Sequence, residues 1–198
     1  MPALRVLEWV RGLETVWTLP PETLDPLRRE FPDVSIVSPS TRAEADALLP
    51  EADVVLGFAV KPANFATATR LRWIHMTAAG IGHTLFPALV ESDVVVTNAR
   101  GMHAVSIAEH TLGVMLSLAR KLHLARDAQF AKRWTQVETW KDAPPLGELR
   151  GATLGLIGFG RIGHEIAVRA NAFGMRVLAV RRRPALEPTR AAAQWGME

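Results

Sequence analysis

The feature that most constrains the fold is a glycine-rich turn between a strand pattern and a helix pattern. The turn reads Gly158-Phe159-Gly160-Arg161-Ile162-Gly163, which is a G-x-G-x-x-G sequence. The apolar run TLGLIGF leads into it, RIGHEIAVRANAFG carries apolar residues at helical spacing, and MRVLAV follows as a second apolar run. An isolated G-x-G-x-x-G is weak evidence, but a strand-helix-strand context predicts a dinucleotide-binding turn. The alternative is a purely structural glycine turn.

Each glycine of the turn has its own physical role. Gly158 allows the tight turn, Gly160 lets the backbone approach a pyrophosphate, and Gly163 lets the helix lie close to the strand. The N–H groups and positive dipole of the helix N-terminus then hold the phosphates. We therefore expect residues 158–163 to bind a dinucleotide.

The second strand of this unit ends in arginines. An Asp or Glu at this point accepts hydrogen bonds from the ribose hydroxyls of NAD, but here Val180 is followed by Arg181, Arg182 and Arg183. A guanidinium pairs with the 2′-phosphate of NADP, which an acid would repel. We expect NADP(H) as cofactor, with NAD as the other possibility, and Arg181 and Arg182 as the contacts. The alternative is a solvated arginine loop in an NAD enzyme.

The first hundred residues alternate between strand and helix patterns. Apolar runs rich in Val, Ile and Leu indicate buried strands at 4–10, 34–37, 52–58, 71–76 and 94–98. Helical patterns lie between them at PETLDPLRREF, TRAEADALL, NFATATR and around LFPALVES, and the second begins with a Thr41-x-x-Glu44 capping box. This alternation predicts an α/β fold with a parallel sheet and helices on both faces.

The middle of the chain has a different character. Residues 103–124 carry apolar side chains around most of a helical circumference, which predicts one helix buried on several sides, between domains or subunits. Residues 125–149 contain Pro144-Pro145 and are interpreted as an irregular arm, with Trp134 and Trp140 as packing anchors rather than ligand contacts. The predicted organisation is a first domain over 1–99, a crossover helix and arm over 100–150, and a partial nucleotide-binding domain over 151–198.

Composition excludes several classes of function. The chain of 198 residues has no cysteine, so disulfide frameworks, thiolate metal sites and cysteine nucleophiles are excluded. A net charge of +3 with dispersed basic residues does not indicate nucleic-acid binding. No signal peptide or membrane-spanning run is recognised, so a cytoplasmic protein without a membrane partner is expected. The histidines and carboxylates show no metal-ligand spacing, so no metal site is assigned.

Three stretches in the same order resemble the D-isomer-specific 2-hydroxyacid dehydrogenases: LRWIHMTAAGIGH, VVVTNARGMHAVSIAEHTLGVMLSLAR and LRGATLGLIGFGRIGHEIAVRANAFGMRVLAV. The resemblance implies a flavodoxin-like N-terminal substrate domain, the first part of a Rossmann domain, and a homodimer formed through the nucleotide domain and its arm. It also implies hydride transfer between NAD(P) and a small 2-keto or 2-hydroxy acid. Glyoxylate or hydroxypyruvate is preferred, with phosphoglycerate, formate and phosphite as alternatives.

The loop MTAAGIG is the candidate substrate-binding element. Ala79 and Gly80 follow a buried strand, and their small size lets backbone N–H groups approach a substrate carboxylate. The resemblance points to the same loop, although Gly82 and His83 stand where many members of the family have an Asp in the next turn. The alternative is an ordinary glycine turn between a strand and a helix.

No catalytic residue is assigned. The resemblance implies an Arg, a Glu and a His that follow the second nucleotide-domain strand, beyond Glu198. Glu109 and His110 are adjacent in sequence, so on a helix their side chains do not face each other. The other histidines considered are interpreted as structural or capping residues: His75, His83 and His103.

The expected consequence is a C-terminally truncated dehydrogenase that is inactive on its own. It is interpreted either as a piece of a longer enzyme or as a degenerate homologue. Uncovered sheet edges and apolar helix faces would then favour association or local disorder beyond about Gly151. The alternative from another class is a non-catalytic dinucleotide-binding protein or corepressor-like regulator.

Overall fold

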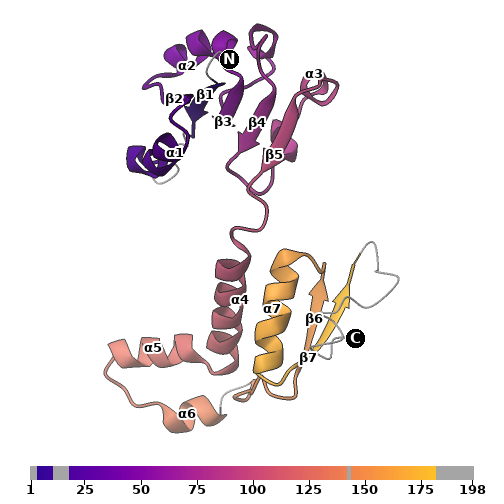
Figure 1. Ribbon diagram of the computed structural model, residues 1–198. Helices are drawn as coiled ribbons and strands as arrows, with labels where there is room; N and C mark the ends of the chain where they lie inside the picture. Colours follow the sequence, from indigo (N-terminus) through magenta and orange to yellow (C-terminus); the bar gives the residue numbers. More distant parts are fainter. Residues whose placement is uncertain (1–3, 11–17, 142–143, 182–198) are drawn as a thin grey trace. The chain divides into compact units, whose positions relative to one another are not determined.

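The structure is a computed structural model that describes residues 4–10, 18–141 and 144–181. The chain divides into two compact units, Met1–Arg100 and Gly101–Glu198. Figure 1 labels the α-helices and strands of both units.

The first unit is built on a five-stranded parallel sheet in the order β2-β1-β3-β4-β5. The strands are β1 (Leu4–Trp9), β2 (Val34–Val37), β3 (Val54–Gly57), β4 (Trp73–Met76) and β5 (Val95–Asn98). Each lies within one of the five predicted runs. This order is the flavodoxin-like one. The predicted α/β fold class is therefore confirmed.

The helices of this unit are short. They are η2 (Pro21–Leu24), α1 (Asp25–Glu30), α2 (Arg42–Leu48), η3 (Leu49–Glu51), η4 (Phe65–Thr67), η5 (Gly82–Thr84) and α3 (Pro87–Val90). The Thr41 hydroxyl accepts the N–H of Glu44 at 3.2 Å, as the capping box predicts. The second hydrogen bond of a capping box goes to the N–H of the N-cap residue. Here the Glu44 carboxylate accepts the N–H of Ser40 at 2.8 Å, one residue earlier. The helix expected at NFATATR is a single 3₁₀ turn.

The core of the first unit lies between this sheet and its connections. Leu49, Val55 and Ile74 are fully buried and pack with Leu7 and Leu89. The expectation that helices cover both faces of the sheet is wrong at β4 and β5. There Trp73 and Val95 are 42% and 58% exposed, and the connections on either side of β4 contain only 3₁₀ turns and the short helix α3. Strands 71–76 and 94–98 are therefore half-buried rather than buried.

The second unit begins with three helices, α4 (Ala104–Ala119), α5 (Leu122–Phe130) and α6 (Gln136–Lys141). The single helix expected over 103–124 is wrong, because the chain turns at Lys121, whose φ is +52°. The Lys121 ammonium is buried and donates to the Thr139 carbonyl at 3.2 Å, which ties the break to α6. The arm expected to be irregular thus contains α6 and most of α5.

The nucleotide-type fold of the second unit is β6 (Thr153–Ile157), α7 (Arg161–Ala172) and β7 (Arg176–Val180). The two strands are parallel, and α7 lies between them and α4 (Figure 1). Ala108 and Leu112 of α4 pack against Ile166 of α7. These elements match the strand-helix-strand pattern of the sequence.

The faces of α4 that do not contact α7 are open to solvent. Val105 and Leu118 are 46% and 63% exposed, so burial of this helix on several sides is not observed in this chain. Trp134 and Trp140 are 86% and 74% exposed, so they do not act as packing anchors within the described part of this chain. The apolar pattern was identified correctly, but no described residue covers it.

Candidate functional site

The glycine turn lies at the carboxyl ends of both strands of the second unit. Ile157 of β6 is in register with Val180 of β7, and the N–H of Gly158 donates to the Val180 carbonyl at 2.7 Å. This bond brings the turn and Arg181 to the same edge of the sheet. Ligands of open α/β sheets bind at this edge.

The glycines occupy positions that side chains would obstruct or strain. Gly158 has a φ of +98°, which favours glycine, and a Cβ at Gly163 would lie 2.7 Å from the Gly158 carbonyl oxygen. No atom lies within 4 Å of the Cβ position of Gly160, so the backbone there is open to an approaching group. The conformation of Gly158, the open space at Gly160 and the close packing at Gly163 are therefore those that the sequence predicts for the three glycines.

The N-terminus of α7 has donors available for an anion. Gly160 is the N-cap residue and provides no side-chain cap. Within the described residues, the N–H groups of Arg161, Ile162 and Gly163 donate to no protein atom. These amides and the helix dipole suit a phosphate group. The local structure thus fits a dinucleotide pyrophosphate.

A cavity of about 500 Å³ opens beside this turn. It is lined by Gly101, Ala104, Val105, Phe159, Gly160, Arg161, His164, Glu165 and Arg181. Sequence reasoning missed the residues from the start of α4, and it also missed His164 and Glu165. Helical spacing is the signal that finds the last two, because they share a face of α7 with Arg161.

The charges of the cavity favour an anion. Arg161 and Arg181 both line it, and the acid Glu165 is engaged by Arg169, whose Nη1 lies 2.6 Å from Oε2 of Glu165. Arg169 also lies 3.7 Å from Glu109. Two guanidinium groups therefore border the cavity while its carboxylate is paired elsewhere. Arg182, the other predicted cofactor contact, lies outside the described residues.

The candidate substrate loop is part of the first unit. Ala79 and Gly80 are exposed, and the Asn98 side chain donates to the Ala79 carbonyl at 2.6 Å. Within the described residues, neither the Ala79 nor the Gly80 N–H donates to a protein atom. The loop is therefore held by its carbonyl while its amides are available to a ligand.

The histidines considered in the sequence lie in ordinary structural surroundings. His75 contacts the Thr97 hydroxyl through Nδ1 at 2.9 Å, and the Trp73 indole donates to the same oxygen at 2.9 Å. His103 is at the N-cap position of α4 without a side-chain capping bond, and His83 lies in η5. Glu109 lies near Arg169 instead of forming a pair with His110. No group of three or more potential metal ligands occurs among the described residues.

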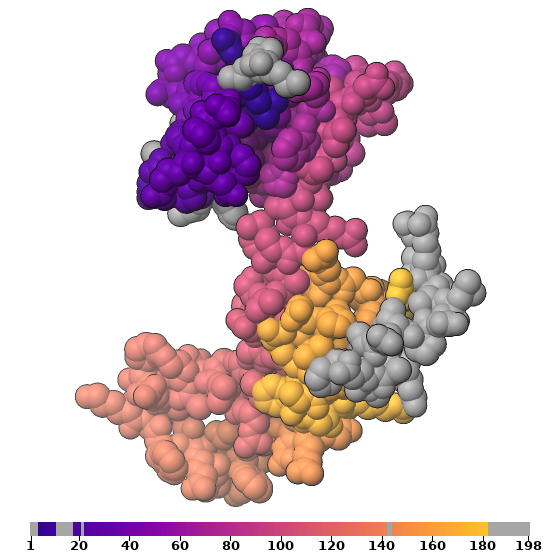
Figure 2. Space-filling model, viewed as in Figure 1, coloured from indigo at the N-terminus to yellow at the C-terminus, as the bar shows by residue number. Residues whose placement is uncertain are grey.

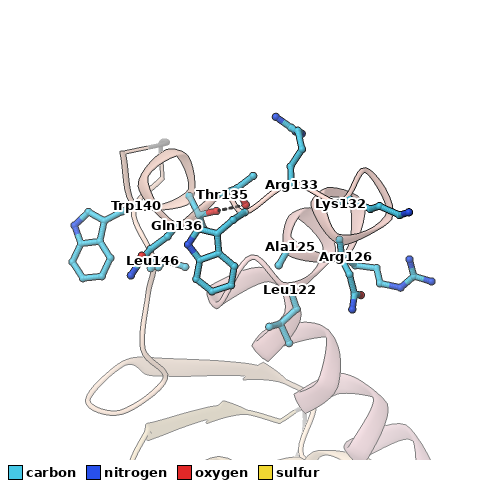
Figure 3. Close-up of a pocket in the computed structure, with 12 residues that line it drawn as sticks. Leu122, Ala125, Arg126, Lys132, Arg133, Thr135, Gln136, Trp140 and Leu146 are labelled. Atoms are coloured by element: carbon cyan, nitrogen blue, oxygen red, sulfur yellow. Dashed lines mark hydrogen bonds between the residues drawn. The ribbon is translucent and has the colours of Figure 1, made fainter.

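A second hollow, of about 920 Å³, lies in the arm between α5 and α6 (Figure 2). Its lining includes Arg126, Lys132, Arg133, Trp134 and Trp140. The charged end of Arg133 points away from those of Arg126 and Lys132, so the cations do not converge on one point (Figure 3). A site for a small anion requires converging donors. The lining of this hollow therefore does not form a small-anion site.

The comparisons with known proteins agree with this geometry. Residues 112–196 match the family model described as D-isomer specific 2-hydroxyacid dehydrogenase, NAD binding domain. Residues 112–196 therefore carry the NAD-binding domain of this family. The resemblance predicted from the sequence is confirmed, and the second unit carries an NAD-binding domain of the Rossmann type.

Two curated relatives and one crystal structure illustrate the similarity. The hydroxypyruvate reductase of Thermotoga maritima is 38% identical over 140 residues, which is 67% of this chain and 42% of the relative. The D-3-phosphoglycerate dehydrogenase of Methanocaldococcus jannaschii is 32% identical over 152 residues, 75% of this chain and 28% of the relative. A family protein from Aeromonas salmonicida has a TM-score of 0.70 at 28% identity, covering 92% of this chain and 56% of that one. The chain thus spans less than half of these curated relatives.

The described residues contain no helix that is both long and apolar enough to cross a bilayer.

Proposed function

We propose that this chain binds a nicotinamide dinucleotide and forms part of an oxidoreductase for small D-2-hydroxy acids and 2-keto acids. The observation that carries the proposal is the turn at Gly158–Gly163, where Gly160 and Arg161 line one cavity together with Arg181 and the first amides of α7 donate to no described residue. A bound nicotinamide would supply the hydride chemistry, while this chain's residues would bind and orient it. The cysteine-free composition suits a reducing cytoplasm.

We assign the preference to NADP(H) over NAD(H). Arg181 follows β7 directly and lines the cavity, where it suits a 2′-phosphate on the adenosine ribose. Arg182 is proposed as a second contact from the sequence alone.

Fluorescence titration of the 198-residue chain with NADPH and NADH tests this assignment. Wild type is expected to bind NADPH more tightly, and Arg181→Asp is expected to weaken NADPH by about tenfold or more through loss of a charge-assisted bond and added repulsion. Arg29→Asp makes the same charge change on the exposed end of α1 and serves as the matched control. Preference for NADH in wild type, or no change in Arg181→Asp, would contradict the assignment.

The substrate class is proposed to be small 2-keto acids such as glyoxylate or hydroxypyruvate. The free amides of Ala79 and Gly80 suit a carboxylate, because adjacent N–H groups form an anion site.

No catalytic acid, base or carboxylate-binding arginine is assigned in this chain. The chain by itself is therefore expected to bind dinucleotide without oxidising NADPH when glyoxylate, hydroxypyruvate or 3-phosphohydroxypyruvate is added. Turnover at a rate typical of enzymes would refute its inactivity.

The second candidate is a non-catalytic dinucleotide-binding regulator. It is favoured by the same binding site combined with the lack of an assigned catalytic group. The genomic sequence after codon 198 discriminates the two. An Arg, a Glu and a His encoded in that order in the same frame favour the enzyme, whereas a stop codon followed by unrelated sequence favours the regulator.

We further propose that the arm mediates homodimerisation. Phe130, Trp134 and Trp140 are each more than 70% exposed, and exposed aromatic side chains grouped in one segment are typical of an interface. Light scattering after gel filtration is expected to give a dimer for wild type and a monomer for the Trp134→Ser/Trp140→Ser double variant. Phe31→Ser, at an exposed position of the first unit, is the control. A monomeric wild type would contradict the proposal.

A further inference from the structure

Gly101, the first residue of the second unit, lies directly against Arg161 of the glycine turn. A Cβ at Gly101 would lie 2.5 Å from Cδ of Arg161 and 3.1 Å from both Nε and Nη1. The aliphatic end of the arginine therefore crosses a bare α-carbon, and any other residue at this position would occupy its space. Both residues line the cavity beside the turn.

Among the described residues, no acid forms an ion pair with Arg161. Within the ranges 4–10, 18–141 and 144–181, its guanidinium makes no ion pair, whereas Arg42 pairs with Asp46 and Arg70 with Asp53. The acid four residues further along α7 is Glu165, which Arg169 engages at 2.6 Å. Glu165 therefore pairs with Arg169 instead of forming the i,i+4 pair that would draw the Arg161 side chain along the helix surface. The guanidinium stays available to an anion.

We propose that Gly101 is a positioning residue for cofactor binding, because its missing side chain lets Arg161 lie beside the amides that open α7. This inference rests on the proposed dinucleotide binding. A guanidinium placed there adds a planar fork of donors to the free amides of the turn, and this combination suits a pyrophosphate. Gly101 belongs to the crossover segment. It lies 57 to 62 residues before the turn in sequence and outside the G-x-G-x-x-G motif.

A side chain at Gly101 should displace the Arg161 side chain more than it destabilises the fold. The atoms that a Cβ would meet belong to a flexible side chain, which moves away readily. Displacement of Arg161 is one effect, and the φ of +100° adds a second, since such a backbone disfavours any L side chain. Gly151 separates the two effects, because its φ is +76° and no atom lies within 4 Å of its Cβ position.

The test is a double-mutant cycle on the 198-residue chain, with NADPH and NADH affinities from fluorescence titration. Gly101→Ala is expected to raise the Kd about tenfold, the factor for one lost charge-assisted hydrogen bond. Arg161→Ala is expected to raise it at least as much, and Gly101→Ala should add nothing in the Arg161→Ala background. Gly151→Ala carries the backbone strain alone and is expected to bind as wild type does. Circular dichroism melts of each variant verify that it is folded.

Each other outcome overturns the inference in a recognisable way. Wild-type affinity in Gly101→Ala shows that Arg161 needs no open space there. Equal weakening by Gly101→Ala with and without Arg161, or equal weakening by Gly151→Ala, assigns the effect to backbone strain. A wild type that binds neither dinucleotide refutes the proposed function itself, and the role given to Gly101 is refuted with it.

Discussion

The two units bury their sheets to very different extents. In the first unit, five strands share a continuous core in which Val55 and Ile74 are completely buried. In the second unit, two strands pack on α7, and Ile157 at the end of β6 is 100% exposed. The same strand-helix-strand order thus gives a closed core in the first unit, whereas in the second unit the described residues cover the sheet on one face only.

The difference shows that the conformation of the glycine turn depends on few strands. The turn at Gly158–Gly163 is set by two strand ends and one helix N-terminus, all of which form locally. A thick core requires more strands, because each added strand buries another row of side chains. Stability and site geometry therefore depend on different parts of this chain.

The largest expected effect comes from an isoleucine pair that compares the two sheets. Ile74→Ala removes a fully buried side chain of β4 and should lower the unfolding free energy of the first unit by about 2–5 kcal/mol. Ile157→Ala changes the fully exposed counterpart and should stay within about 0.5 kcal/mol. Urea unfolding followed by tryptophan fluorescence measures both. Similar losses for the two variants would break the comparison.

A smaller effect is expected where the second unit is tightly packed. Gly163→Ala places a methyl group 2.7 Å from the Gly158 carbonyl oxygen, a backbone atom that cannot move aside cheaply. The expected loss is about 1–3 kcal/mol together with weaker dinucleotide binding. Gly113→Ala on α4 has open space around it and should stabilise by about 0.5–1 kcal/mol. Thermal melts and NADPH titration provide the measurements, and an unchanged Gly163→Ala would refute close helix-strand packing.

A pH-dependent contribution is expected in the first unit at Asp53. The backbone N–H of Arg5 donates to its carboxylate at 3.0 Å and, together with the Arg70 guanidinium, lowers the pKa of Asp53 below its ordinary value of 3.8 despite burial. The folded state thus favours the charged form. Its contribution is complete well above pH 3.8 and is lost as the pH falls through the lowered pKa.

Asp53→Asn should therefore cost about 1–2 kcal/mol near neutral pH, and the difference from wild type should shrink below pH 3.8. Denaturant unfolding between about pH 2 and pH 7 measures it. Arg70→Gln should retain most of the pH dependence, because the Arg5 amide is the largest cause of the lowered pKa. A constant difference across this range would contradict the charged hydrogen bond.

The smallest effect is expected at the surface of the second unit. Glu109 lies 3.7 Å from Arg169 and its side chain is 65% exposed, so solvent and salt screen the pair. Glu109→Gln should change stability by no more than about 0.5 kcal/mol. Thermal melts at low and high salt measure this, and a loss comparable to that of Asp53→Asn would show that ion pairs contribute equally in both units.

Much of the local structure was predictable because short-range chemistry determines it. The five strand patterns, the Thr41 cap and the turn at Gly158–Gly163 each depend on residues close in sequence. The continuous helix expected through Lys121 was wrong. The apolar periodicity continues past Lys121, but the backbone turns there, and the buried Lys121 ammonium stabilises the turn by donating to a carbonyl of α6. The division into 1–99, 100–150 and 151–198, with its dimerisation arm, stays a prediction.

The sequence by itself determined the strands, the glycine turn and the arginine that follows β7, since periodicity, φ requirements and chain order need no distant partner. The tertiary structure decided which residues join the turn in one cavity and which apolar faces stay open. Gly101 meets Arg161 only because α4 packs on α7, and Trp73 is exposed only because short connections adjoin β4. Contacts between residues far apart in sequence depend on how whole elements pack, which local patterns do not encode.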